Sequence, residues 1–323
     1  MGNKTWVSIG VALAAAVSFG AQAQQAYDLR ALNVAVGFVP GPPTNPLITF
    51  DDRFNNGNPL AGGTYTGSII GTGTYSTLAN GLPLSAELSG PDTDFFGVTY
   101  GVGRMRFRLA DATPNPSNLD PLGTATRSSR LILNNPTTTS LLNFGQSFEV
   151  STFWNYTIPD SGSFYGIRVS DNPGSGAAFN DLIDLRVVRG SSGQAAVNLR
   201  RLTSDGSQLT GSALFSQNVS AGLFAGHALA EVRLIELRLH YNALGASNPK
   251  VLRPAFRLVD GGGNDIGLLE FAALGQLPTI FNGETWTSMQ ATANWTLAVP
   301  EPGTWVLMAA GLTTLLLRQR RRV

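Results

Sequence analysis

The sequence predicts an all-β fold, an antiparallel β-sandwich with one apolar helix before it and another after it. Through the middle of the chain, apolar and polar residues alternate with a period of two, which is typical of strands that bury one face. Turn signals rich in Asp, Asn and Gly separate these segments. Charged residues make up only 13% of the chain, against about 25% in an average soluble protein, which argues against helical bundles and coiled coils.

Alternation of this kind predicts strands at residues 104–109, 147–158, 163–170, 182–188, 195–202, 251–259 and 285–297. Residues 231–241 are ambiguous, because their apolar positions shift phase between Leu234 and Ile235. A β-bulge or a helix would each explain that shift. Leu237, Leu239 and Tyr241 alternate cleanly after it, which favours a strand entered through a bulge.

Other parts of the body give weaker signals. We expect short helical turns near residues 179–182 and 267–273, and loose or edge structure at residues 45–84. Since no linker divides residues 24–299, we interpret them as one domain of jelly-roll type. The pattern in residues 235–241, 255–259 and 281–286 resembles concanavalin-like and laminin-G-like sandwiches. That resemblance implies a fold rather than an activity, because the same sandwich serves several functions.

Residues 1–23 have the layout of a secretory signal peptide. Lys4 precedes an apolar run from Trp6 to Phe19, and the small residues Ala21 and Ala23 follow, separated by Gln22. This small-x-small pattern fits a signal peptidase, and we expect cleavage after Ala23. A retained membrane anchor is the alternative, but the apolar run is shorter than the ~20 residues that span a bilayer. The layout indicates export.

The far end, residues 300–323, combines three features. Pro300, Glu301 and Pro302 hold the chain extended. An apolar stretch follows at residues 305–317, and we expect it to form a transmembrane helix. Basic residues close the chain and would keep its end cytoplasmic by the positive-inside rule; they are Arg318, Arg320, Arg321 and Arg322. A tail anchor with an external body is one interpretation.

In this order, the three features also resemble the PEP-CTERM sorting signal of Gram-negative bacteria. The resemblance implies processing by an exosortase, a membrane-embedded transpeptidase-like cysteine enzyme, with Pro300, Glu301 and Pro302 as its recognition element. It further implies a transient stage in the inner membrane and a final place in the outer envelope or extracellular matrix. Proteins of this kind accompany exopolysaccharide production and biofilm formation.

Composition excludes several kinds of site. The chain has no Cys and two His residues, so it has no disulfide framework, thiol nucleophile, Cys-ligated zinc or His-rich metal cluster. Without Lys4, the four tail arginines and Glu301, the body keeps 17 basic and 20 acidic residues. We therefore expect no basic patch along the body and no nucleic-acid partner.

No catalytic residues are predicted. Glu231 and Glu236 lie five residues apart, so a regular strand would point them to opposite faces, which does not suit a retaining glycosidase. His227 and His240 occur without a Gly-x-Ser-x-Gly elbow, and we interpret them as a loop residue and a strand residue. We therefore expect the protein not to be an enzyme.

Calcium is the one cofactor for which the sequence offers ligands, and no other cofactor is expected. Oxygen ligands from Asp and Asn suit this cation, and the weak candidates are Asp260, Asn264 and Asp265. The alternative is a tight turn, in which Asp and Asn bind their own backbone. Gly261, Gly262 and Gly263 fit a hairpin turn better than a phosphate loop.

Five aromatic residues of the body could stack on sugars or pack in the core: Trp154, Tyr156, Tyr165, Trp286 and Trp295. Core packing is the stronger interpretation for most of them. Three hypotheses follow. The first is a structural or adhesive protein of the envelope or matrix, the second a carbohydrate-binding module held in exopolysaccharide, and the third a secreted glycoside hydrolase.

Overall fold

A computed structural model gives the fold of the body. It describes residues 26–37, 47–54, 61–67, 70–80, 87–89, 103–107, 124–134, 147–170, 181–204, 209–210, 213–224, 226–242, 251–270 and 288–298. The predicted signal peptide and the predicted sorting tail lie outside these ranges.

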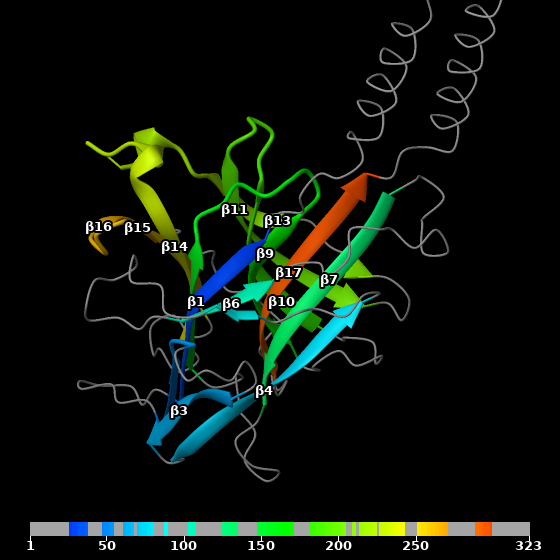
Figure 1. The fold of residues 1–323 in the computed structure, drawn as a ribbon, viewed down its shortest axis with the longest axis vertical. Coiled ribbons are helices and arrows are strands. Elements are labelled where there is room, and N and C mark those ends of the chain that lie inside the picture. The colour runs from blue at the N-terminus through cyan, green and yellow to red at the C-terminus, as the bar shows by residue number, and fades with distance from the viewer. Residues whose placement is uncertain are drawn as a thin grey trace, which may run out of the picture.

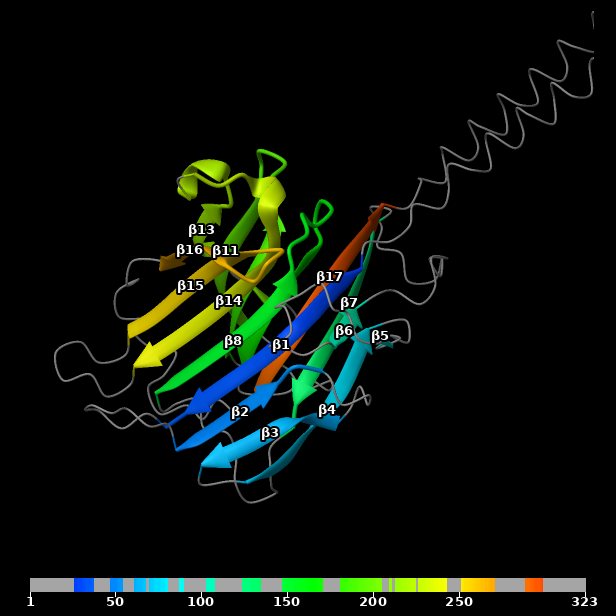
Figure 2. The same ribbon diagram turned by 60° about the vertical axis from the view of Figure 1, so that its left-hand side comes forward.

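Sheet A forms one layer of the molecule and is seen face-on in Figure 2. All of its pairings are antiparallel. β6 (Arg104–Phe107) also pairs with the first residues of β1, and β5 (Glu87–Ser89) pairs with β6. The main strands, in order, are β16 (Asp265–Glu270), β15 (Val251–Asp260), β14 (Val232–Asn242), β8 (Phe148–Asn155), β1 (Tyr27–Val36), β2 (Ile48–Asp52), β3 (Ala61–Gly67) and β4 (Gly71–Asn80).

Sheet B is the second layer and begins at the same strand β4. Its strands continue, again antiparallel, through β7 (Thr124–Leu133), β17 (Ser288–Ala298), β9 (Phe164–Ser170), β10 (Asp181–Arg189), β11 (Ala195–Ser204) and β13 (Ala213–Asn218), with β12 (Leu209–Thr210) beside β11. Figure 1 shows β4 and β7 running side by side at the edge where the layers join. β4 pairs with β3 near Thr74 and with β7 from Tyr75 onward, so one strand closes this side of the sandwich.

The core lies between the two sheets because each strand turns its apolar phase inward. Trp154 of β8 and Tyr165 of β9 are fully buried, with ring centroids 5.2 Å apart. Their polar atoms find partners inside: Trp154 Nε1 donates to Thr152 Oγ1 at 2.8 Å, and the Tyr165 hydroxyl donates to the Thr157 carbonyl at 3.0 Å. Burial raises the pKa of Tyr165. These two rings thus pack between the layers with their polar atoms hydrogen-bonded.

The structure confirms the all-β prediction and the strands that alternation indicated. It also shows a strand entered through a bulge, although the pairing of β14 with β15 shifts register between Val232 and Leu234, just before the predicted position. The expected helical turns are wrong where they are described: residues 181–182 belong to β10, and residues 267–270 belong to β16. Helical geometry in the described ranges is confined to the 3-10 turns η4 (Ala221–Leu223) and η5 (Leu229–Glu231).

Candidate functional site

The first and last described strands meet at one end of the sandwich. Tyr27 opens β1 and Trp295 lies near the end of β17; their rings stack with centroids 5.5 Å apart, and both residues are buried. Figure 2 shows β17 ending close to the start of β1. Because β1 runs away from this end and β17 runs toward it, the described body starts and finishes at the same end of the sandwich.

The residues predicted for processing lie just beyond these strands, outside the described residues. They are Ala21 and Ala23 of the leader, Pro300, Glu301 and Pro302 of the recognition element, and Arg318, Arg320, Arg321 and Arg322 of the basic end. Across the ranges that the structure describes, no helix has both the length and the apolar composition needed to cross a membrane. The two predicted terminal helices fall beyond those ranges.

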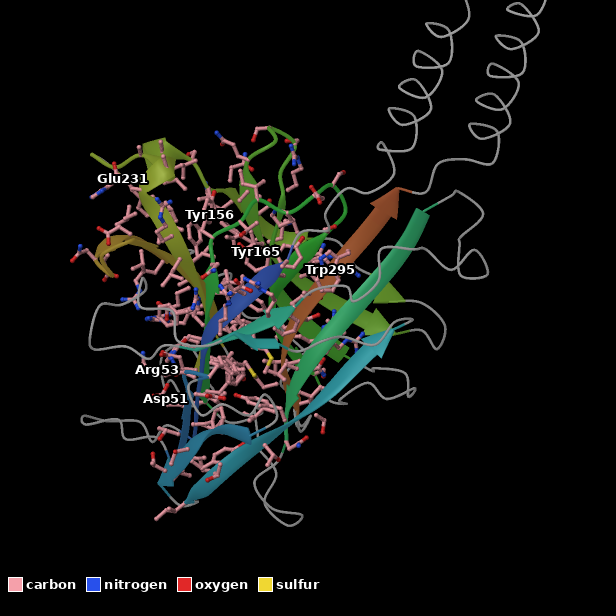
Figure 3. All side chains as sticks on the ribbon, in the orientation of Figure 1. Asp51, Arg53, Tyr156, Tyr165, Glu231 and Trp295 are labelled. Carbon is pink, nitrogen blue, oxygen red and sulfur yellow. The ribbon has the colours of Figure 1, made fainter. Side chains whose placement is uncertain are left out.

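The structure does not bring Glu231 and Glu236 into one site. Glu236 lies on the outer face of sheet A and is only 2% exposed, held by Arg238 at 2.9 Å and Arg257 at 2.7 Å. Glu231 is exposed on η5, at the upper left in Figure 3, where its Oε2 lies 3.0 Å from His227 Nδ1. That contact lowers the pKa of Glu231. Each carboxylate thus has its own cationic or histidine partner.

His240 is on a strand, as predicted, and its Nδ1 lies 3.2 Å from Glu149 Oε2 on the neighbouring β8. Hydrogen bonding to His240 lowers the pKa of Glu149. Both Glu149 and Glu236 line a shallow depression of about 360 Å³ on this outer face, together with Arg238, Arg257 and Asp265. Oppositely charged groups are paired across it, with Arg257 also 3.0 Å from Asp265. Such pairs give a hydrated polar surface.

Three of the five candidate aromatic residues belong to the core. Trp154, Tyr165 and Trp295 are at most 2% exposed, and Figure 3 places Tyr165 and Trp295 inside the ribbon. Tyr156 is partly buried against the same core, and Trp286 lies outside the described residues. The interpretation as core residues is confirmed for these three, which cannot stack on a sugar at the surface.

Asp260 and Asn264 close the turn between β15 and β16. Asp260 Oδ1 accepts hydrogen bonds from the backbone N–H of Gly262 and of Asn264, both at 2.8 Å, and Oδ2 accepts one from Asn264 Nδ2 at 3.0 Å. These bonds, that of the Asn264 side chain first, lower the pKa of Asp260. The third candidate, Asp265, pairs with Arg257. The oxygens therefore serve the turn, and calcium at this turn stays a prediction.

The outer face of sheet B carries a group of arginines that the linear sequence does not reveal. Arg168 of β9 and Asp184 of β10 form a two-pronged ion pair at 2.7 and 2.8 Å, and both are buried. Arg130, Arg186 and Arg200 lie on β7, β10 and β11 of the same sheet. The expectation that no basic patch runs along the body concerned neighbours in the sequence, whereas these arginines are far apart in the chain and meet through strand pairing. The one signal in the sequence is that each arginine occupies the polar phase of its strand.

Comparisons with known proteins identify the tail. The family model of the PEP-CTERM protein-sorting motif matches residues 298–322. No curated protein and no solved structure matches the chain. The matched segment begins at Ala298, the last residue of β17, and contains Pro300, Glu301 and Pro302. The chain therefore carries a PEP-CTERM sorting motif joined directly to an all-β body, which makes it an exported protein directed to the cell envelope and an exosortase substrate.

Proposed function

We propose that the protein is a structural or adhesive component of the outer envelope or extracellular matrix, associated with exopolysaccharide and biofilm, and that it is not an enzyme. The observation that carries this proposal is the sorting motif at residues 298–322, which follows the last strand of the body without a linker. A sorting signal of this kind directs the attached body to the cell envelope, where a structural or adhesive protein would act.

The character of the body supports a role without turnover. Carboxylates on the outer face of sheet A are held by arginines, as Glu236 is by Arg238 and Arg257. Both carboxylate oxygens of Glu236 therefore already have arginine partners, Oε1 in Arg238 and Oε2 in Arg257. The body has few charged residues and an aromatic core, and both features suit a stable scaffold that presents polar surfaces.

Carbohydrate binding is the second candidate. It draws support from the arginine-lined pocket on sheet B, which is described in the next subsection. A secreted glycoside hydrolase has less support, since Glu231 and Glu236 have separate partners.

The deciding experiment concerns processing of the tail. Full-length protein and its Glu301→Ala and Pro302→Ala variants are expressed in a host with and without its exosortase, and each fraction is analysed by intact mass. We expect the unaltered chain to lose its tail and leave the inner membrane only when exosortase is present. Both variants should stay unprocessed there, although residues 305–317 and the basic end are unchanged.

A matched variant separates recognition from membrane orientation. Changing Arg320, Arg321 and Arg322 to Ala leaves the Pro-Glu-Pro element intact and removes three of the four charges expected to hold the end cytoplasmic. We expect this variant to be misoriented, as detected by protease accessibility of the tail. If all of the chains reach the same fraction with the same mass in both hosts, residues 300–323 are a plain anchor and the proposed route is wrong.

A further inference from the structure

The outer face of sheet B contains a pocket of about 470 Å³, within the range of small-molecule sites. It lies over β9, β10, β11 and β17. Its polar lining includes Arg186, Arg189, Asn198, Arg200 and Asn294. The strand register brings these residues together, because Arg186 lies opposite Asn198 and Asn294 lies opposite Phe164. Each of the lining strands therefore contributes its polar phase to one concave surface.

Positive charge exceeds negative charge around this pocket. Among the strand residues that the structure describes, Asp184 is the one carboxylate on the outer face of sheet B, and Arg168 already binds both of its oxygens. Burial, together with the nearby Arg200 and Arg168 and against the opposing effect of Asp184, lowers the pKa of Arg186 to about 10. A guanidinium nevertheless keeps its charge at neutral pH. The described strand residues of this face thus include more arginines than carboxylates.

Arg186 is placed to receive a ligand. Its guanidinium lies over the Phe164 ring, with the central carbon 4.5 Å from the ring centroid, which fixes the orientation of the fork. Its Nε is buried and has no hydrogen-bond acceptor among the described residues. Gly166, directly opposite Arg186 on β9, adds no side chain beside it. A buried donor of this kind is costly unless an acceptor reaches it.

We propose that this pocket binds the carboxylate of an acidic saccharide, with Arg186 and Arg200 holding the carboxylate and Asn198 and Asn294 contacting sugar hydroxyls. Arginine forks match the planar, two-oxygen shape of a carboxylate. Side-chain amides both donate and accept, as hydroxyl groups require. The inference deepens the carbohydrate-binding alternative and rests on it. It does not depend on the sorting route.

The test uses the full-length chain, purified in detergent, and an oligogalacturonate probe in titration calorimetry at low salt. We expect binding that weakens as salt is added, because the contact is charged. A neutral galactose oligosaccharide of the same length should not bind. Arg186→Gln should weaken binding by about tenfold or more, since it removes charge-assisted hydrogen bonds. Arg233→Gln is the matched control, because Arg233 is an exposed arginine of sheet A, and it should bind as the unaltered chain does.

A second variant keeps the test valid if Arg186→Gln folds poorly. Asn198→Asp preserves an oxygen that can accept from Ser216 Oγ, as Asn198 Oδ1 does at 2.6 Å, and adds a negative charge inside the pocket. We expect it to melt normally and to lose oligogalacturonate binding. Unchanged affinity in both variants, or no binding by the unaltered chain, overturns the proposal, whatever the outcome of the processing experiment. If inorganic phosphate binds as tightly as oligogalacturonate, the assignment to a saccharide is wrong.

Discussion

The buried rings of Tyr27 and Trp295 stack with their centroids 5.5 Å apart. This contact holds the first and last strands of the body together. The ring centroid of Tyr27 also lies 5.0 Å from that of Tyr165, so the contact extends into the aromatic cluster between the sheets. Three residues separate Tyr27 from the predicted cleavage point after Ala23, and Val299 alone separates β17 from Pro300. The predicted cleavage point and the sorting motif therefore adjoin, along the sequence, residues that are part of the fold.

The first prediction tests this contact. Trp295→Ala should lower the free energy of unfolding by about 3–5 kcal/mol, because it removes a buried aromatic ring and leaves a cavity against Tyr27. Urea denaturation followed by circular dichroism measures the loss. Ile70→Ala is the control: Ile70 is 84% exposed, and its change should stay within about 0.5 kcal/mol. Equal effects of the two substitutions would show that Trp295 is not in the core.

A second prediction concerns the mature N-terminus. We expect mass spectrometry of the protein from its native host to find Gln24 first, or its pyroglutamate form. Physically, cleavage there leaves three residues before Tyr27, which is 1% exposed and paired with Phe107. A mature protein that begins after Tyr27 would lack part of β1, and one that keeps residues 1–23 would contradict the export signal.

Much of the fold could be predicted from the sequence because strand alternation is a local property. Phe148, Val150 and Trp154 are separated by even numbers of residues along the chain, and all three are buried in the core. Residues 267–270 misled the prediction because Gly267, Leu268, Leu269 and Glu270 have no strict alternation. Pairing with β15 decides their conformation, so tertiary context outweighs local preference.

Strand order, in contrast, cannot be predicted from any local pattern of the sequence. Residues 45–84 were expected to be loose or to lie at an edge, yet they contain β2, β3 and β4, and β4 joins the two sheets. The arginines of sheet B escaped prediction for the same reason. Arg168 and Arg200 lie far apart in sequence, and each is opposite Asp184 on β10. Only the order of the strands makes them neighbours.

The third prediction is a dependence of stability on pH at the turn of Asp260. Its pKa lies below the ordinary 3.8 because Asn264 and backbone N–H groups bind the ionised carboxylate. The folded chain thus takes up this proton less readily than the unfolded chain, so the ionised group adds stability above the ordinary pKa. That contribution is lost as the pH falls through the lowered pKa.

The matching variants at this turn are Asp260→Asn and Asn264→Ala. Both should destabilise the protein at pH 7 and have less effect at about pH 3, below the ordinary pKa, because part of the stability that the ionised carboxylate adds is already lost there. Urea denaturation at the two pH values measures the difference. The same loss at both values would mean that the turn does not depend on the charge of Asp260.

The last prediction concerns the buried pair of Arg168 and Asp184. Asp184 is 0% exposed, and Asp184→Asn would leave Arg168 buried among arginines without its carboxylate. We expect this substitution to lower the free energy of unfolding by about 3–5 kcal/mol, because an uncompensated buried charge costs more than its ion pair contributed.

Replacing both partners gives the opposite expectation. Arg168→Met combined with Asp184→Leu removes both charges from the interior, so the double variant should be more stable than Asp184→Asn alone. Asp265→Asn serves as the control, because its pair with Arg257 is exposed and should contribute no more than about 1 kcal/mol. Urea denaturation compares the three proteins with the unaltered chain. If Asp184→Asn lowers the free energy of unfolding no more than Asp265→Asn does, solvent reaches Arg168. The charges on the outer face of sheet B would then not be shielded from water.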